Sequence, residues 1–177
     1  MNKNTKIIVD KNFYLKTLKA DNVSKDYVKW LNDYEVSKYT EQKYIKHNLK
    51  NVELYVTKMA SSDSHLLFGI FVNQLHIGNV KLGPIKWEHK SADISYFIGD
   101  KKYWGKGLAT KSVKNVVKFA IEKLGIEKIN AGYYEVNKSS EKVLKKCGFE
   151  IEGIKKKEIL FEGKRINKVL VGFSGLK

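Results

Sequence analysis

The 177-residue chain has one cysteine and one proline, and it has no long hydrophobic run. A lone cysteine, Cys147, excludes an internal disulfide. No segment of the signal-peptide type precedes the first strand-like run, so we expect a reducing, cytoplasmic setting. Apolar runs such as residues 66–72 are far shorter than a bilayer span. No repeat, low-complexity tract or linker divides the sequence. We therefore expect one soluble domain over residues 1–177 and no membrane partner.

Arginine is nearly absent as well, although the formal net charge is +15. The planar fork of arginine grips phosphates and base edges best, and Arg165 is the only arginine in the chain. The lysines are spread from Lys3 to Lys177 rather than gathered in a stripe. This pattern argues against a nucleic-acid partner and favours attraction of small anionic molecules.

Strand-like composition occurs in seven places. These are residues 12–19, 66–72, 76–87, 92–99 and 128–136, and two strands within 150–173 that flank Glu162-Gly163. Asn73-Gln74 is expected to form a hairpin turn. Four helices are expected between these strands. They cover residues 23–32, entered at Asp21 or Ser24, residues 47–59, residues 108–124 before Gly125, and a segment between Asn137 and Gly148. Strands therefore precede, separate and follow helices, which predicts an α/β fold.

The stretch KKYWGKGLATKS, residues 101–112, joins a predicted strand to the strongest predicted helix. Gly105 and Gly107 allow backbone angles that a Cβ would forbid, and the first amides of a helix have no intrahelical partner. Such a loop can bind an anion, with Lys102 and Lys106 adding charge, or it can be a tight turn whose glycines serve packing. It matches neither the P-loop nor the Rossmann fingerprint, so a bound phosphate would be held differently from that of ATP or NAD.

Three blocks of the sequence together resemble the GNAT superfamily of acyl-CoA-dependent N-acetyltransferases. Residues 102–107, KYWGKG, are similar to the [QR]-x-x-G-x-[GA] loop of that family, with lysine in the first place. ADISYFIG, residues 92–99, resembles the strand before this loop. NKSSEKVLKKCGFEIEG, residues 137–153, resembles N-x-x-S-x-[RK]-V-x-x-K-x-G-F-x-x-x-G of the branch that contains ribosomal-protein alanine acetyltransferases. The blocks occur in the family's order, and the resemblance covers residues 10–173.

The resemblance implies an α/β (α+β) GNAT-like domain, with a mixed, mostly antiparallel sheet of about seven strands that is splayed at strands 4 and 5 and flanked by about four helices. It also implies acetyl-CoA as cofactor. The cofactor-binding residues would be Phe97, Ile98, Gly99, Lys102, Trp104, Gly105, Lys106, Gly107, Leu108, Ala109, Thr110, Asn137, Ser140 and Lys142. No metal is expected, because the four histidines lack ligand spacing. Cys147 falls on an apolar helix face, where a buried thiol is expected rather than a nucleophile.

The catalytic residues are harder to assign from the pattern. Many family members have a tyrosine five residues before the Phe of the Gly-Phe pair, and here Leu144 occupies that position. Ser140, a water, Tyr133 or Tyr134 are the candidates to replace this general acid. Lys111 also replaces a glutamate that is often found after the loop. For the base, Asp93 is the first candidate, because ADI resembles the A-E-I of histone-type members, and Glu88 and His89 are alternatives.

The acceptor site of the family is built mainly by the first two helices, their loop and the C-terminal hairpin. KWLNDYEVSKYTEQKYIKHN, residues 29–48, resembles acetyltransferases that act on nucleotide-linked amino sugars. The substrate-binding candidates are Trp30, Asp33, Glu35, Tyr39, Glu41 and His89, although Trp30 could equally belong to the core, and Glu35 and Glu41 to the solvated surface. A primary amine of a small molecule is the expected partner. A ribosomal N-terminus, an aminoglycoside or a polyamine is an alternative acceptor, and a non-catalytic CoA-binding module is an alternative function. A monomer or a homodimer is expected.

Overall fold

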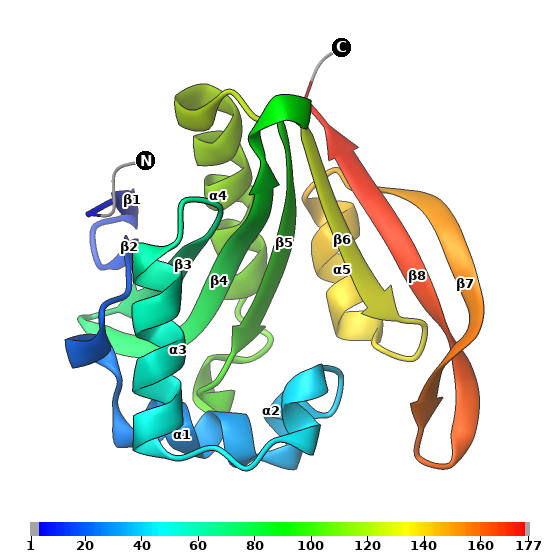
Figure 1. Ribbon diagram of the computed structural model, residues 1–177, viewed down its shortest axis with the longest axis horizontal. Helices are drawn as coiled ribbons and strands as arrows, with labels where there is room; N and C mark the ends of the chain where they lie inside the picture. Colours follow the sequence, from blue (N-terminus) through cyan, green and yellow to red (C-terminus); the bar gives the residue numbers. More distant parts are fainter. Residues whose placement is uncertain (1–3, 176–177) are drawn as a thin grey trace.

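The computed structural model describes residues 4–175, so the predicted domain limits, residues 1 and 177, lie outside the described part of the chain. Its strands form one eight-stranded sheet in the order β1-β2-β3-β4-β5-β6-β8-β7 (Figure 1). The strands are β1 (Lys6–Asp10), β2 (Phe13–Thr17), β3 (Leu66–Val72), β4 (Leu75–Lys86), β5 (Ser91–Ile98), β6 (Lys128–Tyr134), β7 (Glu150–Phe161) and β8 (Lys164–Ser174). Neighbouring strands are antiparallel except β5 and β6, which are parallel. This is the mixed, mostly antiparallel sheet that the sequence predicts.

Five α-helices accompany the sheet within residues 4–175: α1 (Lys25–Asn32), α2 (Tyr34–Ser37), α3 (Leu49–Ser61), α4 (Leu108–Leu124) and α5 (Lys138–Lys146). Four short 3₁₀ turns join them: η1 (Ala20–Asn22), η2 (Glu41–Tyr44), η3 (Trp87–His89) and η4 (Lys101–Tyr103). The main apolar core lies between the sheet and α4 with α5. A second cluster lies under α1 and α3, on the other face. The structure adds β1 and α2 to the seven strands and four helices that were predicted.

Local signals in the sequence set the helix ends. The Ser24 hydroxyl accepts a hydrogen bond from the Tyr27 amide at 3.1 Å, and Ser24 is thereby the N-cap of α1. The Asn137 side chain accepts the Ser140 amide at 3.1 Å and begins α5. Gly125 ends α4 at a φ of 67°, a left-handed angle at which a Cβ is strained.

The strands β5 and β6 are bonded at one end only. Their register contains three residue pairs, from Ser91 opposite Lys128 to Asp93 opposite Asn130. By comparison, β6 and β8 share seven pairs. Beyond Asp93 the two strands diverge, as Figure 1 shows. A strand whose edge is unpaired presents amide and carbonyl groups to whatever occupies the space beside it. The predicted splay is therefore present, and its open end points toward the loop before α4.

Candidate active site

The loop before α4 has the geometry of an anion cradle. Gly105 and Gly107 have φ angles of 72° and 75°, and a Cβ built on either would meet no heavy atom within 4 Å. These glycines are therefore needed for their backbone angles and not for close packing against the protein. The first helical bond of α4 runs from the Lys111 amide to the Gly107 carbonyl at 3.1 Å. The amides of Leu108, Ala109 and Thr110 therefore precede the bonded part of the helix and can donate to an anion.

Charge around the cradle is positive and exposed to solvent. Lys101, Lys102, Lys106 and Lys111 are all exposed residues. The Lys106 ammonium lies 5.3 Å from the centre of the Tyr103 ring, and the Lys102 amide donates to Asp100. The predicted Lys102 and Lys106 thus lie beside the loop, where they raise the local potential without fixing the geometry of a ligand.

Ile98 presents its backbone to the gap between β5 and β6. The Gly99 amide donates to the Ile77 carbonyl of β4 at 2.8 Å. Backbone groups of successive strand residues point to opposite sides, so the Ile98 amide points away from β4. The Trp104 indole bonds the Ile98 carbonyl at 2.8 Å, which agrees with this direction. Of the predicted Phe97, Ile98 and Gly99, only Ile98 therefore offers its amide to the gap.

The N-terminus of α5 borders the gap from the face that carries α4. Asn137 caps this helix through the Ser140 amide, and the Ser140 hydroxyl lies 2.9 Å from the Tyr96 hydroxyl of β5. Lys142 is exposed one residue after Glu141, whose carboxylate pairs with Lys138. The predicted Ser140 thus contacts β5, and Asn137 fixes the helix turn that contains Ser140. Tyr96 is a partner that the sequence patterns did not reveal.

A cluster of aromatic rings with one carboxylate, called the enclosure below, lies on the opposite face of the sheet. Tyr39 stacks on Phe161 with ring centres 5.4 Å apart, and both rings meet Tyr134 edge-on. The Tyr134 hydroxyl donates to the Glu41 carboxylate at 2.9 Å. Burial, and then this bond to a carboxylate, raise the pKa of Tyr134, so the phenol stays protonated. The Lys43 ammonium lies 5.0 Å from the centre of the Phe161 ring.

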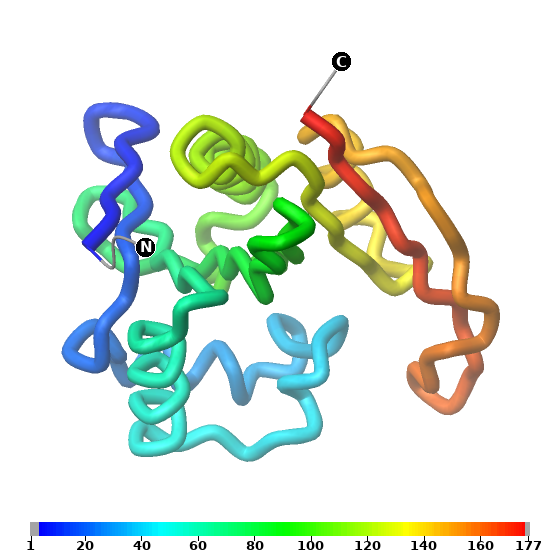
Figure 2. The backbone as a smooth tube through the Cα atoms, turned by 45° about the horizontal axis from the view of Figure 1, so that its top comes forward, coloured from blue at the N-terminus to red at the C-terminus, as the bar shows by residue number. Residues whose placement is uncertain are grey.

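This enclosure joins three parts of the chain that are distant in sequence. The segment from α1 to η2 crosses below the open end of the gap and faces β6 and the β7–β8 hairpin (Figures 1 and 2). A bond of 2.8 Å from the Tyr34 hydroxyl to Glu162 also ties α2 to the hairpin. Phe161 and Lys43 were not predicted as site residues. The only signal in the sequence was the position of Phe161 beside the Glu162-Gly163 turn.

Three of the predicted substrate residues have other partners. A Cβ on Gly99 would overlap the Trp30 ring, so Trp30 packs tightly on β5 within the second core cluster. Asp33 caps α2 and pairs with Lys101 at 2.6 Å, and this hydrogen-bonded pair lowers the pKa of the carboxyl. Glu35 pairs with Lys38 at 2.7 Å. Of the predicted set, Tyr39 and Glu41 are the two that line the enclosure.

The three candidate bases lie toward the closed end of the gap. Asp93 is in the last bonded pair, where its carboxylate accepts the Asn130 side-chain amide at 3.4 Å. Ile98 is five residues further along β5, or roughly 16 Å at the usual strand rise. Glu88 and His89 are exposed in η3, before the first residue of β5. Tyr134 is four residues beyond Asn130, so the Glu41–Tyr134 pair is level with Ile98 along the diverging strands.

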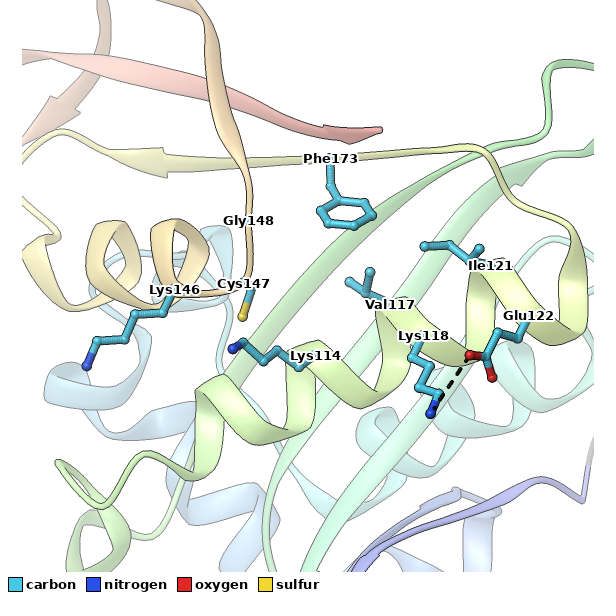
Figure 3. A pocket seen from close by; sticks show the side chains of 9 residues that line it. All are labelled: Lys114, Val117, Lys118, Ile121, Glu122, Lys146, Cys147, Gly148 and Phe173. Carbon is cyan, nitrogen blue, oxygen red and sulfur yellow. Dashed lines mark ion pairs between the residues drawn. The ribbon is translucent and has the colours of Figure 1, made fainter. Parts of the chain in front are cut away.

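A separate hollow of about 460 Å³ lies between α4, the end of α5 and β8 (Figure 3). Lys114 and Lys146 line it, and Lys118 is paired with Glu122 at 3.8 Å. Cys147 lies at its edge, 7% exposed, and burial raises the pKa of the thiol to about 11. A protonated, buried thiol is a poor nucleophile, as predicted. Lys114 is seven residues past Gly107, or about 10 Å along the helix, so this hollow is distinct from the cradle.

Among residues 4–175, no group of three potential metal ligands is found. No helix in the same range is long and apolar enough to cross a membrane. The described part of the site contains backbone amides, hydroxyls, aromatic rings, lysines and the Glu41 carboxylate.

Comparisons with known proteins identify the family. Residues 13–150 match the family described as acetyltransferase (GNAT) domain. The probable N-acetyltransferase YjcK of Bacillus subtilis is 38% identical over 104 residues, which are 57% of each chain. The alignments span about half the length of the curated relatives that the chain matches.

Solved structures show the same fold at low identity. RimL, a ribosomal L7/L12 α-N-protein acetyltransferase in complex with coenzyme A, has a TM-score of 0.86 at 15% identity, over 96% of this chain and 98% of that one. A spermidine N-acetyltransferase from Vibrio cholerae, in complex with CoA and spermine, has a TM-score of 0.82 at 18% identity, over 93% and 96%.

Proposed function

The chain belongs to the GNAT acetyltransferase family, and from this premise we propose that it transfers an acetyl group from acetyl-CoA to a primary amine of a nucleotide-linked amino sugar. The observation that carries the proposal is the position of one gap in the sheet. The gap opens toward a glycine cradle on the α4 side and toward an aromatic, acidic enclosure on the other. A donor and an acceptor can therefore approach the same strand edge from opposite faces.

The donor side would be held by the cradle. The open space over Gly105 and Gly107 admits a pyrophosphate, and the amides of Leu108, Ala109 and Thr110 would donate to it. When bound, acetyl-CoA supplies the acetyl group as a thioester. The Ile98 amide would polarise the thioester carbonyl, since it faces the gap and a fixed donor stabilises charge that develops on oxygen.

Glu41 is our candidate for the base. An amine must lose a proton as the amide forms, and a carboxylate within reach can accept it. The Tyr134 hydroxyl orients Glu41 at the level of Ile98. Asp93 would act only through a chain of waters from the closed end of the gap. Glu88 and His89 lie beyond that end and would have no direct part.

The acceptor class follows from the enclosure. The stacked rings of Tyr39 and Phe161 can pack against the face of a sugar, and Glu41 can bind its amine. The Lys43 ammonium lies over the rings of Tyr134 and Phe161, and it would attract the phosphates of a nucleotide. The same charge would repel a polyamine. The N-terminus of a ribosomal protein is the second candidate, because the rings and the carboxylate alone would also accept a peptide chain with a single amine. An aminoglycoside, the other alternative, carries several ammonium groups, and Lys43 would disfavour it as it does a polyamine.

We propose further that the protein works in the cytoplasm as one domain, as a monomer or a homodimer. The even distribution of lysine and the lone arginine support a small anionic ligand over a nucleic acid.

The test combines binding with turnover. Acetyl-CoA should raise the melting temperature, and thiol release should be measured with nucleotide-linked amino sugars, polyamines, aminoglycosides and a ribosomal N-terminal peptide. Turnover highest with the amino sugars supports the proposal. Stabilisation without turnover on any amine would indicate a non-catalytic CoA-binding module. Salt-sensitive binding of DNA or RNA without stabilisation by CoA would contradict the proposal altogether.

A further inference from the structure

The Lys43 ammonium lies among three aromatic rings, two of which belong to the enclosure. Its nitrogen is 4.9 Å from the centre of the Tyr44 ring, 5.0 Å from that of Phe161 and 5.6 Å from that of Tyr134. No other lysine within residues 4–175 contacts more than one ring. Several rings against one cation form an aromatic cage, which is an arrangement that binds the ammonium groups of ligands.

The rings alone hold the Lys43 ammonium in this cage. In the part of the chain that the structure describes, the ammonium forms no ion pair and no hydrogen bond. Glu41 is only two residues away in sequence, but its carboxylate accepts the Tyr134 hydroxyl. A cation over exposed rings is held weakly, and the lysine stem is flexible. Lys43 can therefore leave the rings when another cation takes its place.

One wall of the cage also holds the candidate base. Tyr134 contributes its ring to the cage, and its hydroxyl donates to Glu41 at 2.9 Å. The Tyr134 side chain is 5% exposed, and the Phe161 ring is supported from one side by the stacked Tyr39 ring. An acceptor ammonium that replaces Lys43 against these rings would lie beside the carboxylate proposed to remove its proton.

We propose that the rings of Tyr44, Tyr134 and Phe161 are a binding site for the ammonium group of the acceptor, and that Lys43 fills this site until the acceptor arrives. The inference rests on the proposed acetyl transfer, and it narrows the acceptor to a molecule that carries an anion as well as an amine. The displaced Lys43 pairs with that anion, for example a phosphate of a nucleotide. One ammonium then replaces another at the rings, and an ion pair is gained.

The same exchange selects against amines that carry no anion. Such an amine must displace a lysine that the chain holds at a high local concentration, and the released Lys43 finds no new partner. Lys43 is therefore a residue that determines specificity, in addition to its attraction of phosphates through its charge.

The first test uses tetramethylammonium, which fits an aromatic cage but has no N–H and cannot be acetylated. Its methyl proton resonance is followed by NMR as protein is added, because rings shift nearby protons upfield. Lys43→Ala should bind the probe at least tenfold more tightly than wild type, with an upfield shift. Lys46→Ala is the matched control, since Lys46 is exposed in the same segment and contacts no ring of the described chain. It should bind the probe as weakly as wild type.

Removal of a ring from the emptied cage should reverse this gain. Phe161→Leu or Tyr44→Ala, each combined with Lys43→Ala, should weaken binding of the probe about tenfold. Tyr44 is 66% exposed, so its removal leaves the core intact if the Phe161 variant does not fold. Equal binding of the probe by wild type and Lys43→Ala would overturn the inference. An equal gain in Lys46→Ala would also overturn it, because net charge alone would then explain the effect.

Acetyl transfer gives a second readout with opposite signs for two acceptors. Lys43→Ala should lower kcat/KM about tenfold for a nucleotide-linked amino sugar and raise it about tenfold for spermidine. A change of the same sign for both acceptors would contradict the exchange. If the probe binds as expected but no amino sugar is acetylated, the proposed function fails while the cage is supported. If amino sugars are acetylated but Lys43→Ala gains no affinity for the probe, the inference alone fails.

Discussion

Replacing Gly107 by valine has two effects that can be measured separately: a loss of folding stability from the strained backbone angle, and a loss of affinity for acetyl-CoA. At a φ of 75° a side chain is strained by about 1–2 kcal/mol. The added Cβ meets no protein atom within 4 Å, so no packing penalty is expected beyond this strain. For a chain of this size the melting temperature should fall by roughly 2–8 °C.

The effect on the cofactor should be much larger, because the valine would occupy the space left for the pyrophosphate. Displacing the anion from two amides at the start of α4 would remove two charge-assisted hydrogen bonds. At about 1.5 kcal/mol each this amounts to about 3 kcal/mol, or roughly 100-fold in affinity. KM for acetyl-CoA in steady-state kinetics and Kd by calorimetry should both rise by that factor.

Gly125→Val is the matched control. Gly125 ends the same helix at a φ of 67°, and a Cβ there also meets no atom within 4 Å. The melting temperature of the Gly125→Val variant should fall by a similar amount, while its KM for acetyl-CoA stays unchanged. If both variants raise KM equally, or if Gly107→Val leaves it unchanged, the loop is a turn and not a cradle.

Three other perturbations test the site and its supports. Glu41→Gln should lower kcat at least 100-fold with the best amine, whereas Asp93→Asn should lower it less than about threefold; the reverse order in pH-rate profiles would return the role of base to Asp93. Folding raises the pKa of Cys147 from 9.0 to about 11, so between these pH values the thiol binds more protons in the folded chain than in the unfolded chain. The contribution of Cys147 to stability should therefore fall as pH rises from about 9 to 11. Cys147→Ala should flatten that part of the curve of denaturant midpoint against pH, and an unchanged slope would refute the assignment. Asn137→Ala removes the bond to the Ser140 amide and should cost about 1 kcal/mol in urea unfolding, while an unaltered midpoint would show that α5 needs no side-chain cap.

The helices were predictable because their signals are local. Ser24 and Asn137 each cap a helix within three residues of themselves, and Gly125 ends α4 through its own backbone angle. The two elements that were not predicted have weaker signals. β1 alternates between exposed and half-buried residues at the edge of the sheet, and α2 has only four residues. Neither buries enough apolar surface for its pattern to stand out.

The site residues likewise fall into those with local sequence signals and those brought together only by the fold. The cradle lies within one short loop, so Gly105 and Gly107 stood out by their spacing, but only the resemblance to the GNAT family favoured an anion site over a tight turn. The enclosure could not be found in this way, because Glu41 and Tyr134 are 93 residues apart and their contact depends on the order of the strands. Contacts between distant parts of the chain also explain why Trp30 and Asp33, which were expected to line the acceptor site, have other partners. These partners, Gly99 and Lys101, are far away in sequence. The pattern of residues 29–48 places Asp33 near the site, but it does not show that Lys101 neutralises the carboxylate.

The three-pair junction between β5 and β6 also affects the mechanics of the sheet. It has fewer than half the bonded pairs of the β6–β8 interface. The elements from β6 onward are joined to the rest of the sheet by this junction and by the apolar core that they share with α4. The bonds of Tyr34 to Glu162 and of Tyr134 to Glu41 bridge the two halves at the opposite end. The two parts of the sheet are thus joined by the short β5–β6 junction at one end and by these two hydrogen bonds at the other. An acceptor that replaces either bond would change the separation of β5 and β6 where the donor binds. Amide hydrogen exchange should be fastest in β5 and β6 beyond their three bonded pairs, and slowest in β3 and β4, where the sheet is continuous on both sides.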